Sequence, residues 1–292
     1  MTLTHNGLVR KQGLSETDLQ AIFELEAICN THDNLKLKLN PDLLKIRPTT
    51  ETNDFLYYQD GKLVGFLPLF CFNRQEAEFS GMVHPDYRRQ GIFTALAQAA
   101  REEIRSRQVP KILYIVPNSS ASGKAWMQAS GFAYEFSEFW MKMQEVKPCA
   151  AIHELTMRLA EERDEDILTR ALTVCFNLPE DAMRKSVTDR REPGRARYAI
   201  ELAGDVIGTI GVHYDDESST AFLYGFCILP DFQGQGYGRQ AMMWSIHKAL
   251  ADGMQHVELE VATENDNALN LYRSCGFDVI SGNDYYAEHL TV

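Results

Sequence analysis

Apolar and polar residues follow two different periods along the second half of the chain, and these periods predict its elements. Apolar residues spaced three and four apart predict helices over 165–177, 179–189, 238–253 and 264–276. Alternating or continuous apolar runs predict strands over 195–204, 205–214, 218–229, 256–261 and 277–290. Three strands joined by turns and followed by a strand–helix–strand crossover predict an α+β domain with a mixed sheet.

The first half of the chain repeats this pattern at an offset of 145 residues. The stretch HPDYRRQGIF (84–93) aligns with LPDFQGQGYG (229–238), and ASGF (129–132) falls on SCGF (274–277) without a gap. A repeat of this length indicates two copies of one domain rather than a solenoid.

We therefore predict two domains, one over residues 1–145 and one over residues 146–292. The boundary is expected near EVKPCA (145–150), where a proline follows a strand-like run.

Composition indicates a chain with well-filled cores. Of the 292 residues 45% are hydrophobic and 24% are charged, which argues against disorder. The apolar run at 64–73 is too short to span a bilayer and the N-terminus has no apolar leader, so we expect a cytoplasmic protein without a membrane partner. The six cysteines form no CxxC pair or Cys/His cluster, which indicates reduced thiols and no metal.

The net charge of −12 lies almost entirely in the second half. Residues 1–145 hold 16 Lys and Arg against 17 Asp and Glu, whereas residues 146–292 hold 13 against 24. This acidity argues against a nucleic-acid partner and suits a cationic amine or basic peptide. A need for solubility explains it equally well.

Three glycines alternate where the 238–253 helix is expected to begin: Gly234, Gly236 and Gly238. Glycine lets the backbone bend and come close to a ligand, and a helix N-terminus attracts anions. The pattern is typical of a phosphate-binding loop, although a turn that only needs left-handed residues would look the same.

Two separated motifs in the second copy resemble the GNAT (GCN5-related) N-acetyltransferases. The first is Q-G-Q-G-Y-G (233–238) on the pattern Q/R-x-x-G-x-G/A, and the second is Asn265 with Tyr272. The resemblance covers most of 151–292 and, more weakly, most of 1–145. It implies an α+β fold with two tandem GNAT-like domains, each a mixed, mostly antiparallel twisted sheet flanked by helices.

The same resemblance implies acetyl-CoA as co-substrate, no metal, and an N-acetyltransferase that acetylates a primary amine of a small molecule or peptide. It assigns the pantetheine arm to the backbone of Cys227, Ile228 and Leu229. It assigns the pyrophosphate to Gln233, Gly234, Gln235, Gly236, Tyr237 and Gly238. Asn265 would fix a gap between diverging strands, although helix capping explains this residue almost as well.

For catalysis the resemblance implies that Tyr272 meets the leaving thiolate. A phenol titrates near 10 and a thiol near 8.5, so a hydrogen bond accounts for more of this role than proton donation. Glu260 is the candidate base, and the spacing resembles the bacterial ribosomal-protein N-acetyltransferases. Glu258 lies two residues earlier on the same strand face and could raise the pKa of its neighbour. Tyr224 or a water molecule could serve instead.

The first copy lacks much of this chemistry. Its loop reads Arg88-Arg89-Gln90-Gly91-Ile92-Phe93, and Met127 stands in the column of Tyr272. We expect this domain to be degenerate and the C-terminal domain to be catalytic. The alternative is a non-catalytic tandem protein that binds CoA as a sensor or scaffold.

The acceptor pocket is expected around 165–195 and 280–288, with the acidic run 215–218 and Asp284 as candidate attractors for a cation. The acyl length stays open. A tandem pair could act as a monomeric pseudo-dimer or form a homodimer.

Overall fold

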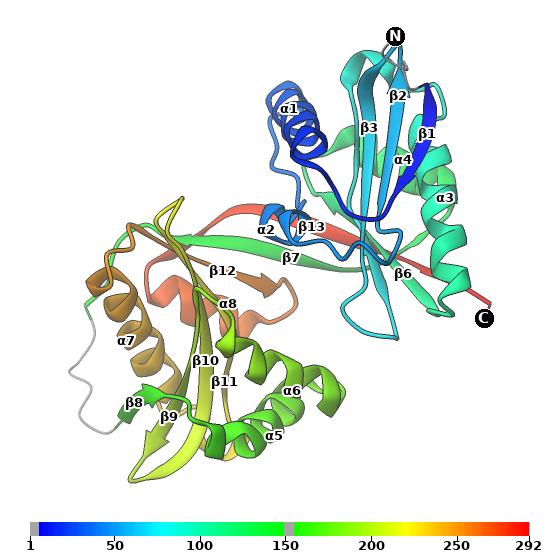
Figure 1. Ribbon diagram of the computed structural model, residues 1–292. Helices are drawn as coiled ribbons and strands as arrows, with labels where there is room; N and C mark the ends of the chain where they lie inside the picture. The colour runs from blue at the N-terminus through cyan, green and yellow to red at the C-terminus, as the bar shows by residue number, and fades with distance from the viewer. Residues whose placement is uncertain (1–5, 149–154, 292) are drawn as a thin grey trace. The chain divides into compact units, whose positions relative to one another are not determined.

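The structure, a computed structural model, describes residues 6–148 and 155–291. Its contacts divide the chain into two units (Figure 1). Unit 1 comprises Met1–Ser137 and Ser281–Val292, and unit 2 comprises Glu138–Ile280. Residues 149 and 150 of the predicted boundary lie outside the described residues, and the division of the two copies after residue 145 stays a prediction.

Unit 1 is built on a mixed sheet in the order β1-β2-β3-β4-β6-β13, with β5 paired to β3. Every pair in it is antiparallel except β4 with β6. Its elements are β1 (Gly7–Lys11), α1 (Glu16–Asp33), α2 (Pro41–Lys45), β2 (Asp54–Gln59), β3 (Lys62–Phe70), β4 (Ala77–Phe79), β5 (Met82–Val83), η1 (Pro85–Tyr87), α3 (Ile92–Ser106), β6 (Lys111–Pro117), α4 (Ala121–Ser130) and the first part of β7 (Ala133–Met143).

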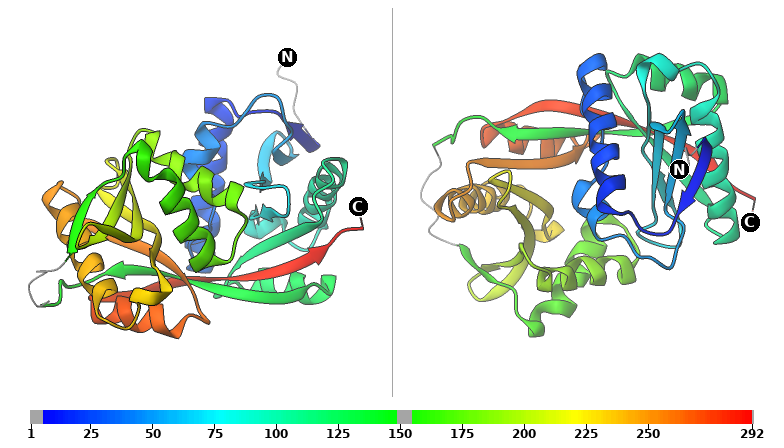
Figure 2. Two further views of the ribbon diagram at one scale, coloured as in Figure 1. Left: turned by 90° about the horizontal axis from the view of Figure 1, so that it is seen from below. Right: turned by 45° about the horizontal axis from the view of Figure 1, so that its top comes forward.

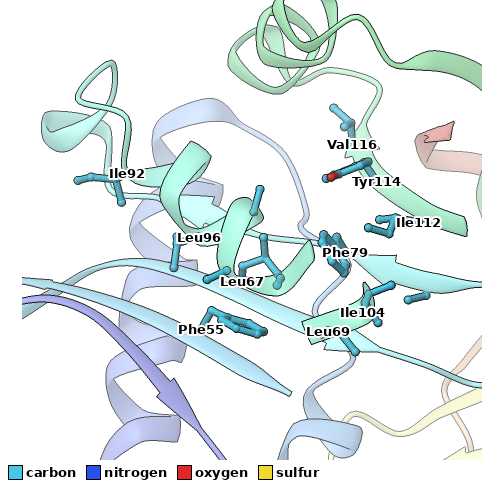
Figure 3. Packing of buried hydrophobic residues seen from close by; sticks show 14 of the residues in the cluster. Phe55, Leu67, Leu69, Phe79, Ile92, Leu96, Ile104, Ile112, Tyr114 and Val116 are labelled. Carbon is cyan, nitrogen blue, oxygen red and sulfur yellow. The ribbon is translucent and has the colours of Figure 1, made fainter. Parts of the chain in front are cut away.

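Helices cover both faces of the unit 1 sheet. Phe55 and Leu67 alternate with neighbours that point the other way, and they pack with Leu96 of α3 in one core (Figure 3). Leu56 and Phe66 pack on the opposite face with α1. Because side chains alternate along β2 and β3, each strand contributes residues to two separate cores, one on each face of the sheet.

Unit 2 repeats this plan with the order β7-β12-β11-β10-β9-β8, in which only β11 and β12 are parallel. Its elements are β8 (Leu155–Leu159), η2 (Glu162–Asp164), α5 (Glu165–Phe176), α6 (Glu180–Thr188), η3 (Asp189–Arg191), β9 (Arg195–Leu202), β10 (Asp205–Asp215), β11 (Thr220–Ile228), η4 (Pro230–Phe232), α7 (Tyr237–Ala251), β12 (His256–Ala262), α8 (Asp266–Ser274) and the start of β13 (Phe277–His289). The helices and strands predicted for the second copy are all present.

The two faces of the unit 2 sheet bury different helices (Figure 2). Leu223, Leu259 and Met242 belong to the core that α7 and α8 cover. Ala199 and Leu172 belong to the core that α5 and α6 cover. We call these the α7/α8 face and the α5/α6 face.

Each sheet is completed by a strand that the sequence pattern alone does not assign to it. Residues 138–142 of β7 pair with β12 in unit 2, and residues 283–289 of β13 pair with β6 in unit 1. Asp284 therefore belongs to unit 1, where it pairs with Lys124 at 3.0 Å and accepts a hydrogen bond from Ser137 at 2.7 Å. The expectation that Asp284 attracts a cationic acceptor stays a prediction, and its carboxylate is already engaged by Lys124 and Ser137.

The expected architecture is confirmed: the fold is α+β, with two mixed and mostly antiparallel sheets flanked by helices. None of the described helices has the length and apolar character needed to cross a membrane.

Candidate functional site

Strands β11 and β12 of unit 2 separate part of the way along their length. Their parallel pairing runs from Thr220 with His256 to Leu223 with Leu259. Both strands continue beyond this point, β11 paired to β10 and β12 paired to β7. The inner edge of β11 is therefore open from residue 224 onward, and an extended ligand with amide groups could pair with it as an added strand.

A β-bulge lies at the start of this open edge, and the sequence interpretation missed it. The register of β10 with β11 shifts between Thr209 opposite Cys227 and Gly211 opposite Tyr224. Gly225 has a φ of +52° within the bulge. A glycine inside an apolar strand was the available signal, because such a glycine often marks a bulge.

The three residues expected to pair with pantetheine lie on this edge. Leu229 donates its backbone N–H to Ile207 of β10 at 2.8 Å. Along a strand, neighbouring residues direct their backbone groups to opposite sides. The N–H and C=O of Ile228 therefore face the open edge, whereas the backbone groups of Cys227 and the N–H of Leu229 face β10. The Leu229 carbonyl accepts the N–H of Phe232 at 2.9 Å.

The glycine loop adopts the conformation that its sequence predicts. Gly234 and Gly236 have φ values of +74° and +85°, and Gly236 is the N-cap of α7. A Cβ at either position would meet no described atom within 4 Å, so the glycines supply backbone freedom rather than close packing. Gly238 lies inside the first turn, where a Cβ would sit 3.5 Å from Leu271.

The side chains around the loop hold it in place. Gln233 donates from Nε2 to the Ile228 carbonyl at 2.7 Å, and Gln235 donates from Nε2 to the Asp231 carbonyl at 3.2 Å. Tyr237 packs, partly buried, in the cluster that contains Ile228. Since these side chains are used within the protein, the loop offers a ligand mainly its backbone N–H groups at the helix N-terminus.

Asn265 is the N-cap of α8. Its Oδ1 accepts the backbone N–H of Ala268 at 3.0 Å, as Ser120 does for Gly123 in unit 1. The capping role that competed with a role in cofactor binding is thus present in the structure.

Tyr272 lies on α8 with 8% of its surface exposed, in the core of the α7/α8 face. Its ring contacts Phe277 edge-on at a centroid distance of 6.1 Å. Burial raises the pKa of Tyr272 to about 12. The hydroxyl therefore stays protonated at neutral pH and can donate a hydrogen bond, but it is a weak proton donor to a thiolate.

Glu260 lies on β12 opposite Trp140 of β7. Val257, Leu259 and Val261 belong to the α7/α8 core, so Glu258 and Glu260 occupy the α5/α6 face.

Glu258 is held by its neighbours on β7. Its carboxylate accepts a hydrogen bond from Trp140 Nε1 at 2.7 Å and pairs with Lys142 at 3.5 Å. Lys142 thus balances the charge that was expected to act on Glu260, which weakens the idea of a like-charge pair.

Tyr224, the alternative base, lies on the same face as Glu260. Its ring rests against Gly211, where a Cβ would come within 2.6 Å of Cζ. The guanidinium groups of Arg195 and Arg197 lie 5.6 Å and 5.2 Å from the ring centroid.

Unit 1 has a loop of the same conformation as residues 233–238 but lacks the two candidate catalytic side chains. Arg89 and Gly91 have φ values of +64° and +78°, close to those of Gly234 and Gly236. Arg88 forms a bidentate pair with Asp33 at 2.7 and 2.9 Å, so its charge is already balanced. Beside this loop lies a cleft of about 330 Å³ lined by β5, the N-terminus of α3, β6 and α4.

The positions of Glu260 and Tyr272 correspond in unit 1 to Ile115 and Met127, which both line that cleft. Neither side chain can accept or donate a proton, so this unit lacks the two candidate catalytic groups.

A repeated thiol contact was also missed at the sequence level. Cys175 on α5 donates to the Ile228 carbonyl at 3.5 Å, and Cys29 on α1 donates to the Val83 carbonyl at 3.5 Å. The two cysteines are 146 residues apart rather than 145, so the ungapped comparison did not align them. Among the residues that the structure describes, no group of three or more His, Cys, Asp or Glu side chains could hold a metal ion.

Comparison with known proteins agrees with this geometry. A mycothiol acetyltransferase of Propionibacterium freudenreichii is 25% identical over 291 residues, which cover 94% of this chain and 90% of that protein. A GCN5-related N-acetyltransferase from Sphaerobacter thermophilus matches with a TM-score of 0.79 at 18% identity, over 97% of this chain and 95% of the other. A tandem GNAT protein from the clavulanic acid biosynthesis pathway matches with a TM-score of 0.71 at 16% identity, over 97% and 98%.

The family model described as "Acetyltransferase (GNAT) family" matches the chain twice, over residues 19–132 and 157–277. The resemblance stated from the two sequence motifs is thereby confirmed, as is the tandem arrangement. The chain belongs to the acetyltransferase (GNAT) family and is an acyltransferase with two GNAT domains.

Proposed function

We propose that unit 2 transfers the acetyl group of acetyl-CoA to a primary amine. The observation that carries this proposal is the open edge of β11, which the glycine loop follows in the chain. It is supported by Tyr272 and Glu260, which lie on opposite faces of the unit 2 sheet. Acetyl-CoA would lie along the edge, with its pantetheine beside Cys227, Ile228 and Leu229 and hydrogen-bonded to the Ile228 N–H, which faces the open edge. Its pyrophosphate would meet the backbone of residues 233–238.

Because Tyr272 and Glu260 lie on opposite faces of the sheet, each would contact a different reactant. Tyr272 is on the α7/α8 face, where the CoA sulfur would lie, and Glu260 is on the α5/α6 face, where the amine would arrive. Glu260, directly or through water, takes the proton from the amine. The amine nitrogen bonds to the acetyl carbon, the carbon–sulfur bond breaks, and the thiolate leaves with a hydrogen bond from Tyr272.

The bulge supplies a further element of this site. The backbone N–H of Phe226, the residue after Gly225, is our candidate donor to the thioester oxygen while negative charge develops there. The candidate acceptor is a small-molecule or peptide amine, and cationic character is consistent with the net charge of −12.

The test is thiol release from acetyl-CoA with a panel of amines, which should include the acceptor of the mycothiol acetyltransferase from Propionibacterium freudenreichii. We expect Glu260→Gln and Tyr272→Phe each to lower kcat by about 10- to 1,000-fold. Glu258→Gln, a change of the same kind on the same strand, is the matched control and should have a much smaller effect. Unchanged kcat in both of the first variants would contradict the assignment.

A second function, CoA sensing in unit 1, is favoured by the 330 Å³ cleft beside a loop of the same conformation. Calorimetric titration of the Tyr272→Phe/Glu260→Gln variant with CoA separates the two functions. Two binding sites per chain support a ligand role for unit 1, and a single site that Gly236→Ala weakens by about 5- to 30-fold restricts binding to unit 2.

Cytoplasmic location, the absence of a metal and of nucleic-acid or membrane partners, and the choice between monomer and homodimer stay predictions. Size-exclusion chromatography with light scattering tests the last of these.

A further inference from the structure

Arg197 is the largest fully buried side chain of unit 2, with 0% of its surface exposed. It lies on β9, on the α5/α6 face, and no carboxylate of the described residues forms an ion pair with it. A buried guanidinium without a carboxylate is costly to fold, and burial lowers the pKa of Arg197. Because its burial lowers the free energy of unfolding, stability does not explain why an arginine occupies this position.

Its hydrogen bonds lead to the bulge of β11. Nη1 donates to the Gly225 carbonyl at 3.4 Å and to Thr209 Oγ1 at 3.5 Å. Nη2 donates to the carbonyl and hydroxyl oxygens of Ser186, in the last turn of α6, at 3.2 and 3.1 Å. The Arg197 side chain therefore links the C-terminal end of α6, which lies on the face proposed for the acceptor, to the Gly225 carbonyl in the bulge.

The space around Gly225 is shaped by this guanidinium. A Cβ on Gly225 would lie 3.2 Å from Nη2 and 3.3 Å from Nη1. Together with its φ of +52°, this contact explains why glycine is required there. The ring of Tyr224 covers the guanidinium at 5.2 Å.

The peptide that Arg197 contacts is the one that carries the N–H of Phe226. In a planar trans peptide the C=O and the N–H point in opposite directions. Because the Gly225 carbonyl points to Arg197, the Phe226 N–H points away from it. A cationic donor on the carbonyl also polarises the peptide and makes its N–H a stronger hydrogen-bond donor.

We propose that Arg197 is a positioning residue for acetyl transfer: it fixes the β11 bulge and polarises the Gly225–Phe226 peptide so that the Phe226 N–H stabilises the thioester oxygen. This inference rests on the proposed function of unit 2. Arg197 does not touch the substrate. Its positive charge lies behind the donating peptide, where it also favours the negative charge that develops on that oxygen.

The test compares Arg197→Met with Arg195→Met. Arg195 lies two residues away on the same strand face, over the same Tyr224 ring, and pairs with Glu192 at 3.0 Å. It therefore controls for loss of an arginine beside this tyrosine. We expect Arg197→Met to lower kcat by about 10- to 100-fold with a less than about threefold change in KM for acetyl-CoA, because an oxyanion donor is misplaced while binding contacts remain. Arg197→Lys keeps the charge and should recover part of kcat.

A second readout does not depend on the acceptor. Infrared difference spectra of bound acetyl-CoA with a ¹³C-labelled carbonyl should show a carbonyl band shifted to lower frequency in the wild type. The shift should be smaller in Arg197→Met and unchanged in Arg195→Met. Thermal unfolding should show that Arg197→Met is as stable as the wild type or more stable, since an apolar residue replaces an unpaired buried charge.

The outcomes separate the two proposals. A wild type that transfers no acetyl group to any amine in the panel overturns the proposed function itself. An active wild type with equal kcat and equal carbonyl frequency in Arg197→Met overturns the role of Arg197 alone. A loss of kcat explained entirely by a smaller folded fraction would also overturn it, because that is the result of a purely structural role.

Discussion

Asp54 of unit 1 is buried against a single arginine, and its titration predicts how the stability of this unit depends on pH. Its side chain is 0% exposed, neither carboxylate oxygen has a hydrogen-bond partner among the described residues, and Arg47 Nη2 lies 3.4 Å from Oδ1. Burial raises the pKa of Asp54 from 3.8 to about 6, and the charge of Arg47 offsets part of this rise.

The direction and size of the effect follow from this shift. Because the folded-state pKa lies above the unfolded-state value, the folded protein binds the proton more tightly. The resulting stability is fully present below about pH 4 and is lost as the pH rises through about 6. A rise of the Asp54 pKa from 3.8 to about 6 corresponds to about 3 kcal/mol in the free energy of unfolding. Between about pH 4.5 and about pH 7, the loss is about 2 kcal/mol.

The assay is urea unfolding of the wild type and of Asp54→Asn at several pH values. Replacing Trp140 and Trp244 with phenylalanine in both proteins leaves Trp126 as a reporter in unit 1. The amide does not titrate, so the wild type should lose about 2 kcal/mol relative to Asp54→Asn over this range.

Asp42→Asn is the matched control, since Asp42 is 63% exposed in its ion pair with Lys45. Its difference from the wild type should stay nearly constant with pH. A constant difference for Asp54→Asn as well would refute the reasoning, because it would mean that burial does not shift this carboxyl.

Three further predictions concern unit 2. Gly236→Ala should raise KM for acetyl-CoA by about 5- to 30-fold, because alanine costs about 1–2 kcal/mol of backbone strain at a φ of +85°. Gly253→Ala is the control: this glycine has a φ of +94° but follows the other end of α7, so KM should not change. Asn265→Ala should lower the stability of unit 2 by about 1 kcal/mol in thermal unfolding through loss of the α8 cap, whereas Asn267→Ala should not. Tyr272→Phe should lower kcat equally from about pH 6 to about pH 10, because a phenol with a pKa of about 12 does not titrate in that range; a changed alkaline limb of the pH profile would contradict this.

The sequence was informative where function depends on local backbone geometry. Alternating glycines at 234 and 236 predicted a left-handed loop before a helix, and both have positive φ. The 145-residue repeat also located the corresponding loop of unit 1, in which Arg89 adopts the same conformation without being a glycine. Short-range patterns of this kind are set by a few neighbouring residues.

Long-range pairing was not predictable in the same way. The alternating pattern of β13 suits the edge of any half-buried sheet, so nothing local indicates that residues 283–289 pair with β6. Arg197 was missed for a related reason. An arginine in an alternating strand is usually exposed to solvent. Arg197 is buried because its neighbours are small: Gly211 lies opposite it on β10, and Thr209 and Gly225 accept its hydrogen bonds.

In both units a phenylalanine ring fills the space beside the first turn of the helix that follows the loop, α7 in unit 2 and α3 in unit 1. The two units differ in the element from which this ring comes. In unit 2 the ring is Phe226 of β11, and its Cζ lies 3.8 Å from a Cβ built on Gly238. In unit 1 the corresponding residues are exchanged: Phe93 is the second residue of α3, and its Cε2 lies 3.0 Å from a Cβ built on Gly81. The space is filled in both, so packing alone does not select either arrangement. Only the arrangement of unit 2 leaves the first turn of the helix without a side chain at this position, and that is also the unit that contains Tyr272 and Glu260.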